Sequence, residues 1–340
     1  MPTAAPSLFR PVQPRLQWVE PPPADAARVE RLAADLRLPL PLCRILAQRG
    51  FDVPEAAKRF LRPRREHLHS HSALAGIEEA GERLARAVRS GEMILVHGDY
   101  DVDGVCGTAL LTRALTMMGA AVTPFVPHRL EHGYDLTSPG VQAAAAAGAS
   151  LIVTTDCGIV AHAAVRDAAA AGIDVIVTDH HTPGDTLPAA LSVINPNRAD
   201  CAYPEKGLAG AGVAYKLACA AAEVLGYPEE RLAPLIEMVA IATIADLAPL
   251  TAENRAIVRW GLAVLANTPN TGLRALLAST GLAGRPEITA GHVGYVLAPR
   301  INAVGRVGTA MSAVRLLLTE DPREAEQLAN LHELENRRRR

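Results

Sequence analysis

Short apolar runs alternate with longer Ala-rich or Leu-rich segments through the middle of the chain. The runs cover residues 93–97, 121–125, 150–154 and 174–177, and each segment between them is long enough for a helix. Strands that alternate with helices predict right-handed crossover connections and a parallel sheet. The predicted fold class is therefore α/β, a parallel sheet flanked by helices, followed by a mostly helical C-terminal part.

The same spacing predicts how the rest of the chain is organised. Residues 1–22 are rich in proline and are expected to form an extended arm. Residues 23–92 are expected to be helical, with Gly50 as a helix stop and an amphipathic helix over 76–91. Residues 93–250 then form the α/β core, residues 251–320 a helical region, and residues 321–340 a final helix.

Composition narrows the function classes. With 49% hydrophobic and 21% charged residues the chain has a soluble globular composition, and its net charge of −2 gives no overall nucleic-acid signature. Arginine supplies 31 of the 34 basic residues and makes forked phosphate contacts, although a biased genome composition explains the same excess. The five cysteines form no Cys-x-x-Cys pair and indicate a reducing cytoplasm. The first 20 residues lack the apolar run of a signal peptide.

An acidic stretch follows the first apolar run. His97, Asp99, Asp101 and Asp103 occupy alternate positions directly before a helix-like run that starts at Val105. Alternate residues of an extended segment face the same way, so these four side chains are predicted to point at one spot. Carboxylates that close repel each other unless a cation lies between them. The stretch predicts a divalent metal site; the alternative is an acidic turn with Asp103 as the N-cap of the helix.

Two more predicted strands end in possible ligands. Asp156 follows the third strand, and Asp179, His180 and His181 follow the fourth. Ligands gather at the carboxyl ends of parallel strands, so these groups are expected at one edge of the sheet. Asp246 closes an apolar helical run, where an ionised carboxylate needs a charge partner; a surface aspartate at a helix end is the alternative.

Asp and His ligands without thiolates favour Mn²⁺ or Mg²⁺ over a structural zinc. The set is large enough for two ions that share a bridging carboxylate. Such a pair clamps the oxygens of a phosphoryl group and lowers the pKa of an attacking water, which predicts phosphoester hydrolysis. The chain has neither a P-loop nor a dinucleotide-binding glycine fingerprint, so nucleoside-triphosphate use and hydride transfer have no support.

Two basic segments are candidates for phosphate contact. Residues 58–65, followed by three histidines, form the most basic patch, although a solvated surface explains it equally well. Near the C-terminus, a predicted glycine turn interrupts the helical pattern over residues 299–306. The polar side chains around it suit a phosphate clamp, and they are Arg300, Asn302 and Arg306.

The acidic motifs, in their order, resemble those of the DHH phosphoesterase superfamily. They read HGDYDVDG at 97–104, TDCG at 155–158, DHH at 179–181 and ADLAPL at 245–250. Tyr100 and the segments 212–217 and 299–306 are similar to the RecJ family of single-strand-specific DNA exonucleases. The resemblance covers about residues 40–335. It implies an enzyme of DNA repair and recombination that uses two Mn²⁺ or Mg²⁺ ions to degrade single-stranded DNA 5′ to 3′ into 5′-mononucleotides. It also implies a single-strand-binding protein and a helicase as partners.

The resemblance further implies roles for individual residues. His181 would contact the scissile phosphate, with Asp101 and Asp103 beside it as catalytic residues, and Arg129 would bind a substrate phosphate. Asp135 stands where the family usually has glycine. One ion would be held by Asp103, Asp156, His180 and Asp246; the other by Asp101 and Asp156, with His97 as a possible third ligand; the DNA backbone would be held by Arg300, Asn302 and Arg306.

The chain departs from the family at its end. Family members continue past a long linking helix into a second lobe and an oligonucleotide-binding fold, whereas this chain stops on that helix. We expect the catalytic lobe alone to be a slow, poorly processive nuclease. One alternative is another DHH enzyme, an oligoribonuclease and nucleotide phosphatase or a cyclic-dinucleotide phosphodiesterase, which usually has proline where Tyr100 stands. The other is an inactive DHH scaffold, which would lack some of these carboxylates.

Overall fold

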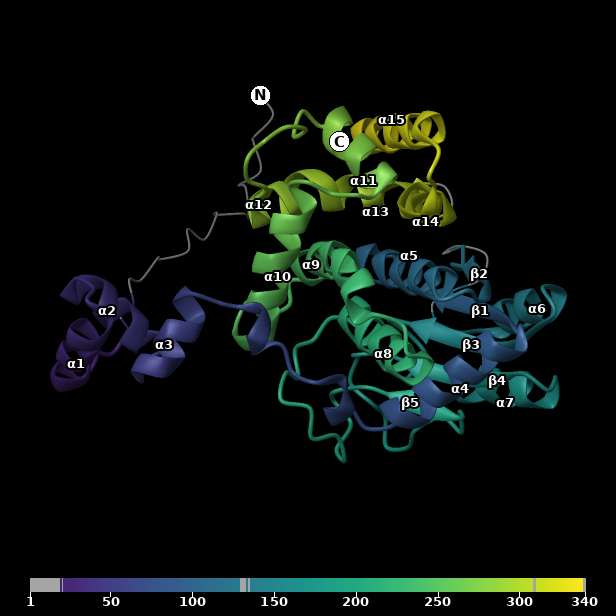
Figure 1. Ribbon diagram of the computed structural model, residues 1–340, viewed down its shortest axis with the longest axis horizontal. Helices are drawn as coiled ribbons and strands as arrows, with labels where there is room; N and C mark the ends of the chain where they lie inside the picture. The colour runs from purple at the N-terminus through teal and green to yellow at the C-terminus, as the bar shows by residue number, and fades with distance from the viewer. Residues whose placement is uncertain (1–18, 20, 129–132, 134, 308–309, 339–340) are drawn as a thin grey trace, which may run out of the picture. The chain divides into compact units, whose positions relative to one another are not determined.

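A computed structural model describes residues 19, 21–128, 133, 135–307 and 310–338, without the side chains of residues 304–307. The chain divides into two compact units, residues 1–62 and residues 63–340 (Figure 1). Among the described residues, no helix is both long and apolar enough to cross a lipid bilayer.

The N-terminal unit is a small group of three helices, α1 (Ala26–Leu36), α2 (Leu40–Gln48) and α3 (Pro54–Leu61). Asp25 caps α1 by accepting a hydrogen bond from the amide of Arg28 at 2.9 Å. Pro41 and Pro54 lie in the first turns of α2 and α3, where a missing amide hydrogen costs nothing. The core of this unit is small and consists of Val29, Leu32, Cys43, Leu46 and Ala57.

A five-stranded parallel sheet organises the second unit, with strand order β2-β1-β3-β4-β5. This confirms the predicted α/β class. Four of the strands fall on the four apolar runs, and β5 has only three residues, too few to stand out as an apolar run. The strands are β1 (Met93–Gly98), β2 (Ala121–Phe125), β3 (Ala149–Thr155), β4 (Asp174–Thr178) and β5 (Ser192–Ile194).

Helices cover both faces of this sheet because successive side chains of each strand point to opposite sides. Ile94 and Val96 of β1 pack against α4 (Ile77–Ser90), α5 (Val102–Met117) and α8 (Gly210–Leu225). Leu95 packs on the other side, with α6 (Ser138–Ala146) and α7 (His162–Ala170) (Figure 1). The carboxyl ends of β1, β3 and β4 therefore lie side by side between two helical layers.

The C-terminal part is helical, as expected. Its α-helices are α9 (Ile236–Ala245), α10 (Ala252–Leu265), α11 (Thr271–Ser279), α12 (Ala290–His292), α13 (Ala298–Val307), α14 (Met311–Leu318) and α15 (Pro322–Arg338). A π-helical turn, η5 (Val293–Leu297), connects α12 to α13. Short 3-10 turns are η1 (Arg65–His67), η2 (His71–Ala73), η3 (Glu229–Arg231) and η4 (Ala233–Leu235).

The predicted glycine turn over residues 299–306 is wrong, because that segment is helix α13. Pro299 is the second residue of α13 and directly follows the π-helical turn, where the hydrogen-bond pattern already departs from the α-helix. Gly305 lowers helix stability by only about 1 kcal/mol relative to alanine, which the packing of a long helical layer offsets.

Candidate metal centre

The turn between β1 and α5 carries three carboxylates, but it is not extended. β1 ends at Gly98 and α5 begins at Val102, so the predicted alternation of side chains over residues 97–103 is wrong. Asp101 is the N-cap of α5: its Oδ1 accepts from the amides of Asp103 at 2.9 Å and Gly104 at 3.0 Å. The turn folds back so closely that a Cβ at Gly104 would lie 2.5 Å from the carbonyl oxygen of Asp99. Asp103 lies in the first helical turn rather than at the cap.

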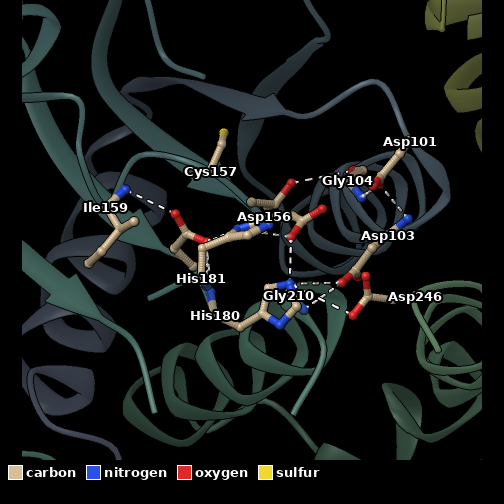
Figure 2. Close-up of polar contacts among 12 residues, drawn as sticks. Asp101, Asp103, Gly104, Asp156, Cys157, Ile159, His180, His181, Gly210 and Asp246 are labelled. Carbon is tan, nitrogen blue, oxygen red and sulfur yellow. Dashed lines mark hydrogen bonds and ion pairs between the residues drawn. The ribbon is translucent and has the colours of Figure 1, made fainter. Parts of the chain in front are cut away.

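Asp103 is buried and connects the β1 turn to α8. Its two carboxylate oxygens accept from the amides of Gly210 and Ala211, each at 2.7 Å (Figure 2). These amides belong to the first turn of α8, which lacks intrahelical acceptors for them. Burial, with a further contribution from Asp101, raises the pKa of Asp103 to about 8. The helix terminus thus fixes the carboxylate, while its surroundings disfavour the charge.

His180 meets three carboxylates that come from distant parts of the sequence. Its Nε2 lies 3.0 Å from Oδ1 of Asp156, 3.6 Å from Oδ2 of Asp103 and 4.0 Å from Oδ2 of Asp246 (Figure 2). Asp156 directly follows β3 with a left-handed φ of 62°, and Asp246 ends α9 as its C-cap. The β1, β3 and β4 ends and the end of α9 therefore converge on one place.

His181 is held by the carboxylate of the preceding motif residue. Oδ1 of Asp179 lies 2.8 Å from Nδ1 of His181 and also accepts from the amides of His180 at 2.7 Å and His181 at 3.1 Å. Its Oδ2 accepts from the amide of Ile159 at 2.9 Å (Figure 2). The hydrogen bond that the imidazole donates to the carboxylate of Asp179 raises the pKa of His181 to about 9. The half-exposed imidazole is thus oriented and protonated at neutral pH.

The convergence leaves polar atoms without satisfied hydrogen bonds. Within the described chain, Oδ1 of Asp99, Oδ1 of Asp156 and Nε2 of His180 are buried and make no hydrogen bond. Burial raises the pKa of Asp99 to about 7 and that of Asp156 well above its ordinary value, with neighbouring carboxylates adding to the effect. Unpaired buried polar groups cost about 1–3 kcal/mol each, and more when charged. A bound cation would satisfy these atoms.

The geometry supports three overlapping groups of candidate ligands, each with atoms within 4.8 Å of one another. They are Asp103, His180 and Asp246; Asp156, His180 and His181; and Asp99, Asp101 and Asp156. Asp156 and His180 each belong to two groups, which suits two ions that share ligands. Oxygen and imidazole donors without thiolates fit Mn²⁺ or Mg²⁺.

His97 does not join these groups. Its ring is fully buried, with Nδ1 at 3.6 Å from Sγ of Cys157 and its centroid 5.3 Å from that of Phe125. A Cβ at Gly140 would lie 2.7 Å from its Nε2. Burial lowers the pKa of His97 to about 4, so it is neutral. Because the chain bends after Gly98, His97 and the following aspartates do not share one face.

The residues expected to hold DNA lie outside this centre or outside the described part of the chain. Arg129 lies outside the described residues, as does the side chain of Arg306. Arg300 forms an ion pair with Glu333 of α15 and donates to the carbonyl of Val296 at 2.7 Å. Asn302 is half-buried in α13.

The structure defines the roles of four residues of this site. Asp99, expected only as part of the acidic stretch, lies with Asp101 and Asp156 in one group of candidate ligands, and Asp179, expected as a possible ligand, orients His181. Asn195 and Asn197, directly after β5, donate to the carbonyls of His181 and His180 at 2.9 and 2.6 Å. The two aspartates lie inside the recognised motifs, so the sequence already marked their positions. No motif marks the loop that carries the two asparagines.

Known proteins resemble this chain in sequence and in family. The DHH family, N-terminal domain, matches residues 93–243. The chain is 40% identical over 306 residues to the single-stranded-DNA-specific exonuclease RecJ of Bacillus subtilis, covering 90% of this chain. It is 46% identical over 268 residues to the RecJ of Thermus thermophilus, covering 78% of this chain. Over most of its length the chain is similar to RecJ, and its α/β part matches the DHH family. It spans 38% of the length of each of these two RecJ proteins.

Solved RecJ structures have the same fold. RecJ from Thermus thermophilus in complex with Mn²⁺ superposes with a TM-score of 0.78 at 39% identity, over 93% of this chain and 44% of that one. The complex of that RecJ with Mg²⁺ gives 0.70 at 36% identity, over 93% and 41%. The part of RecJ that this chain matches therefore includes the DHH lobe.

Proposed function

We propose that this chain is the catalytic lobe of a two-metal exonuclease that hydrolyses single-stranded DNA 5′ to 3′ and releases 5′-mononucleotides. One observation carries the proposal: four separate segments bring Asp103, Asp156, His180 and Asp246 together, and the buried Oδ1 of Asp156 and Nε2 of His180 among them make no hydrogen bond, which suits a bound cation. The metal-bound RecJ relatives support the assignment of Mn²⁺ or Mg²⁺.

The chain's own residues divide into two ligand sets. We assign Asp103, His180 and Asp246, with Asp156, to one ion, and Asp99 and Asp101, again with Asp156, to the other. When bound, the two ions would lower the pKa of an attacking water and stabilise the charge that develops on the phosphate. Asp103 keeps its position because two helix amides hold it, and Asp101 keeps its position as a helix cap.

His181 acts on the phosphate rather than on an ion. Asp179 fixes its ring through Nδ1, and the imidazole as a whole is half exposed. With a pKa of about 9 the ring carries a proton at neutral pH and can donate it in a hydrogen bond to a phosphate oxygen. His181 therefore binds and polarises the scissile group.

We further propose that the DNA backbone is held by Arg129, Arg300, Asn302 and Arg306. Contacts to phosphates carry no sequence information and weaken with salt, so binding should be sequence-independent and salt-sensitive. Arg300 would have to exchange Glu333 for a phosphate, a change of partner that a guanidinium can make without losing its charge. We also propose that the protein acts in the cytoplasm and that its partners are a single-strand-binding protein and a helicase.

The deciding experiment is Mn²⁺-dependent digestion of 5′-labelled single strands. We expect slow, poorly processive release of mononucleotides by the 340-residue chain, and none after Asp156→Ala, because that change removes the shared ligand. EDTA should abolish the activity of the unsubstituted chain. Undiminished cleavage by Asp156→Ala would refute the metal assignment, and preference for dinucleotides over long strands would refute the substrate.

A further inference from the structure

The N-terminal unit exposes large apolar side chains on its surface. Leu42 and Ile45 of α2 are 49% and 46% exposed, and Leu61 at the end of α3 is 37% exposed. Single exposed leucines are common on protein surfaces, but these lie close together on two neighbouring helices. This unit therefore leaves an apolar face unfilled by its own small core.

These side chains line one groove. The groove has a volume of about 430 Å³ and lies entirely within residues 35–62. That volume is within the range of about 300–1,000 Å³ typical of ligand sites. Its apolar lining is mainly aliphatic and comprises Leu36, Leu38, Leu42, Ile45, Leu46 and Leu61. A short run of apolar side chains could be buried there.

The rim of the groove is basic. Arg49, Lys58 and Arg62 line it, against the single carboxylate of Asp35. Lys58 pairs at the surface with Glu55 at 2.8 Å, whereas among the contacts of the described residues Arg49 and Arg62 have no acidic partner. An exposed ion pair contributes little, so Lys58 remains available to a ligand. The groove thus combines an aliphatic floor with an excess of positive charge.

The charge and the lining select among possible occupants. A single nucleic-acid strand needs free aromatic faces for its bases, but Phe60, the one aromatic residue of the lining, is already stacked on Phe51 with centroids 4.1 Å apart. The chain's first 18 residues carry two arginines and no acidic residue, so their charge is not complementary. A second copy of the chain would bring the same basic rim into contact with itself.

We propose that this groove is a docking site for an acidic amphipathic peptide of a partner protein. Leucine-like side chains of the peptide fill the aliphatic floor, and its carboxylates face Arg49, Lys58 and Arg62. This is the helix-in-groove mode, in which apolar anchors at i, i+3, i+4 and i+7 provide affinity and the charged rim provides orientation. The site lies within the N-terminal unit, shares no residue with the metal centre and needs no DNA.

The test uses the full 340-residue chain and three fluorescein-labelled synthetic helical peptides. The first has leucines at i, i+3, i+4 and i+7 with glutamate and aspartate elsewhere, the second replaces every acidic residue with lysine, and the third replaces the leucines with alanine. Fluorescence anisotropy should detect binding of the first peptide and at least about tenfold weaker binding of the other two. Equal binding of the acidic and basic peptides, or no binding of either, would overturn the proposal.

Matched variants localise the binding. Leu42→Asp should weaken binding of the acidic peptide by about tenfold or more, whereas Leu40→Asp should leave it unchanged, because Leu40 is equally exposed on the same helix but does not line the groove. Exchange of both Arg49 and Arg62 for glutamate should also weaken binding. Circular dichroism checks that each variant is folded. An equal loss in Leu40→Asp, or displacement of the peptide by single-stranded DNA, would refute the site. So would a dimer that sediments without peptide and disappears in Leu42→Asp.

Discussion

The metal centre and the groove of the N-terminal unit depart from the usual distribution of polarity in opposite directions: the centre buries polar groups, and the groove exposes apolar ones. In the centre, three carboxylates are buried; in the groove, leucines and an isoleucine are exposed. Both arrangements cost free energy in the isolated chain, because buried polar atoms lose water and exposed apolar atoms meet it. The two regions differ in the ligand that would offset this free-energy cost: a small cation in the metal centre, and an apolar and acidic surface in the groove.

The two regions also differ in how firmly they are held. Asp103 and Asp179 accept several backbone hydrogen bonds each, from α8 and from the ends of the strands. The groove is supported by three short helices around a core of five buried residues. A site for chemistry needs fixed atoms, whereas a docking surface needs only a complementary shape and charge.

Asp246→Asn should have the largest effect of the variants that separate the two regions. Asp246 is a candidate ligand at the end of α9 whose side chain makes no hydrogen bond to the backbone of the described residues, so the change removes charge and leaves the fold. Loss of several kcal/mol of transition-state stabilisation corresponds to about 10³-fold in rate. Single-turnover digestion of labelled single strands with Mn²⁺ measures it. Retention of wild-type rate with unchanged Mn²⁺ dependence would exclude Asp246 from the centre.

Asp179→Asn should have a smaller effect, about 10- to 100-fold in rate, as is usual for residues that orient a functional histidine. The asparagine still accepts one of the backbone hydrogen bonds but no longer stabilises protonated His181. Because Asp179 is not a proposed ligand, Mn²⁺ affinity measured by calorimetry should change much less than the rate. Asp167→Asn, on the exposed side of α7, is the matched control. A parallel loss of rate and Mn²⁺ affinity would assign Asp179 to the metal instead.

The sequence was sufficient for four of the five strands but not for the local conformation of the turns. These four strands were visible as apolar runs, and parallel topology then placed their polar ends together. The bend after Gly98 was not visible, since a sequence of alternating aspartates suits an extended strand and a helix cap alike; consequently His97 was placed on one face with Asp99, Asp101 and Asp103. The helix through Pro299 and Gly305 was missed because the π-helical turn before it depends on packing.

Residue spacing also could not reveal contacts made across long separations. The asparagines after β5 hold the carbonyls of His180 and His181 through a loop that has no motif of its own. The groove was equally invisible, because exposed leucines at helical spacing look the same as core leucines until the helices are packed. Motifs therefore predicted most of the candidate ligands, whereas the hydrogen bonds that hold these ligands in place became visible only in the structure.

Glu237→Gln should stabilise the fold at alkaline pH. Glu237 is a buried carboxylate that is not a candidate metal ligand, so this variant distinguishes the cost of burial alone from the effects of the metal centre. Burial in α9 raises the pKa of Glu237 to about 7, from 4.5 in the unfolded chain. Folding is therefore progressively penalised as pH rises from about 4.5 to 7, and the full penalty of about 2–3 kcal/mol applies above that. Urea unfolding should show the gain of the glutamine variant at pH 8 and not at pH 4.5. Mn²⁺ should leave this gain unchanged; a gain equal at both pH values would disprove its electrostatic origin.

Leu42→Asp should have the smallest effect on stability, within about 0.5 kcal/mol. The side chain of Leu42 is half exposed to water in the folded unit, so its replacement removes little buried apolar surface. Leu46, one turn away on α2, is 6% exposed and belongs to the core of the same unit, so Leu46→Asp should cost at least about 3 kcal/mol. The free energy of unfolding of the two variants can be compared in urea, with proteolytic cleavage within the N-terminal unit as the probe of its unfolding. If Leu42→Asp destabilised that unit as much as Leu46→Asp, Leu42 would be part of its core, and the groove would be filled by the chain itself.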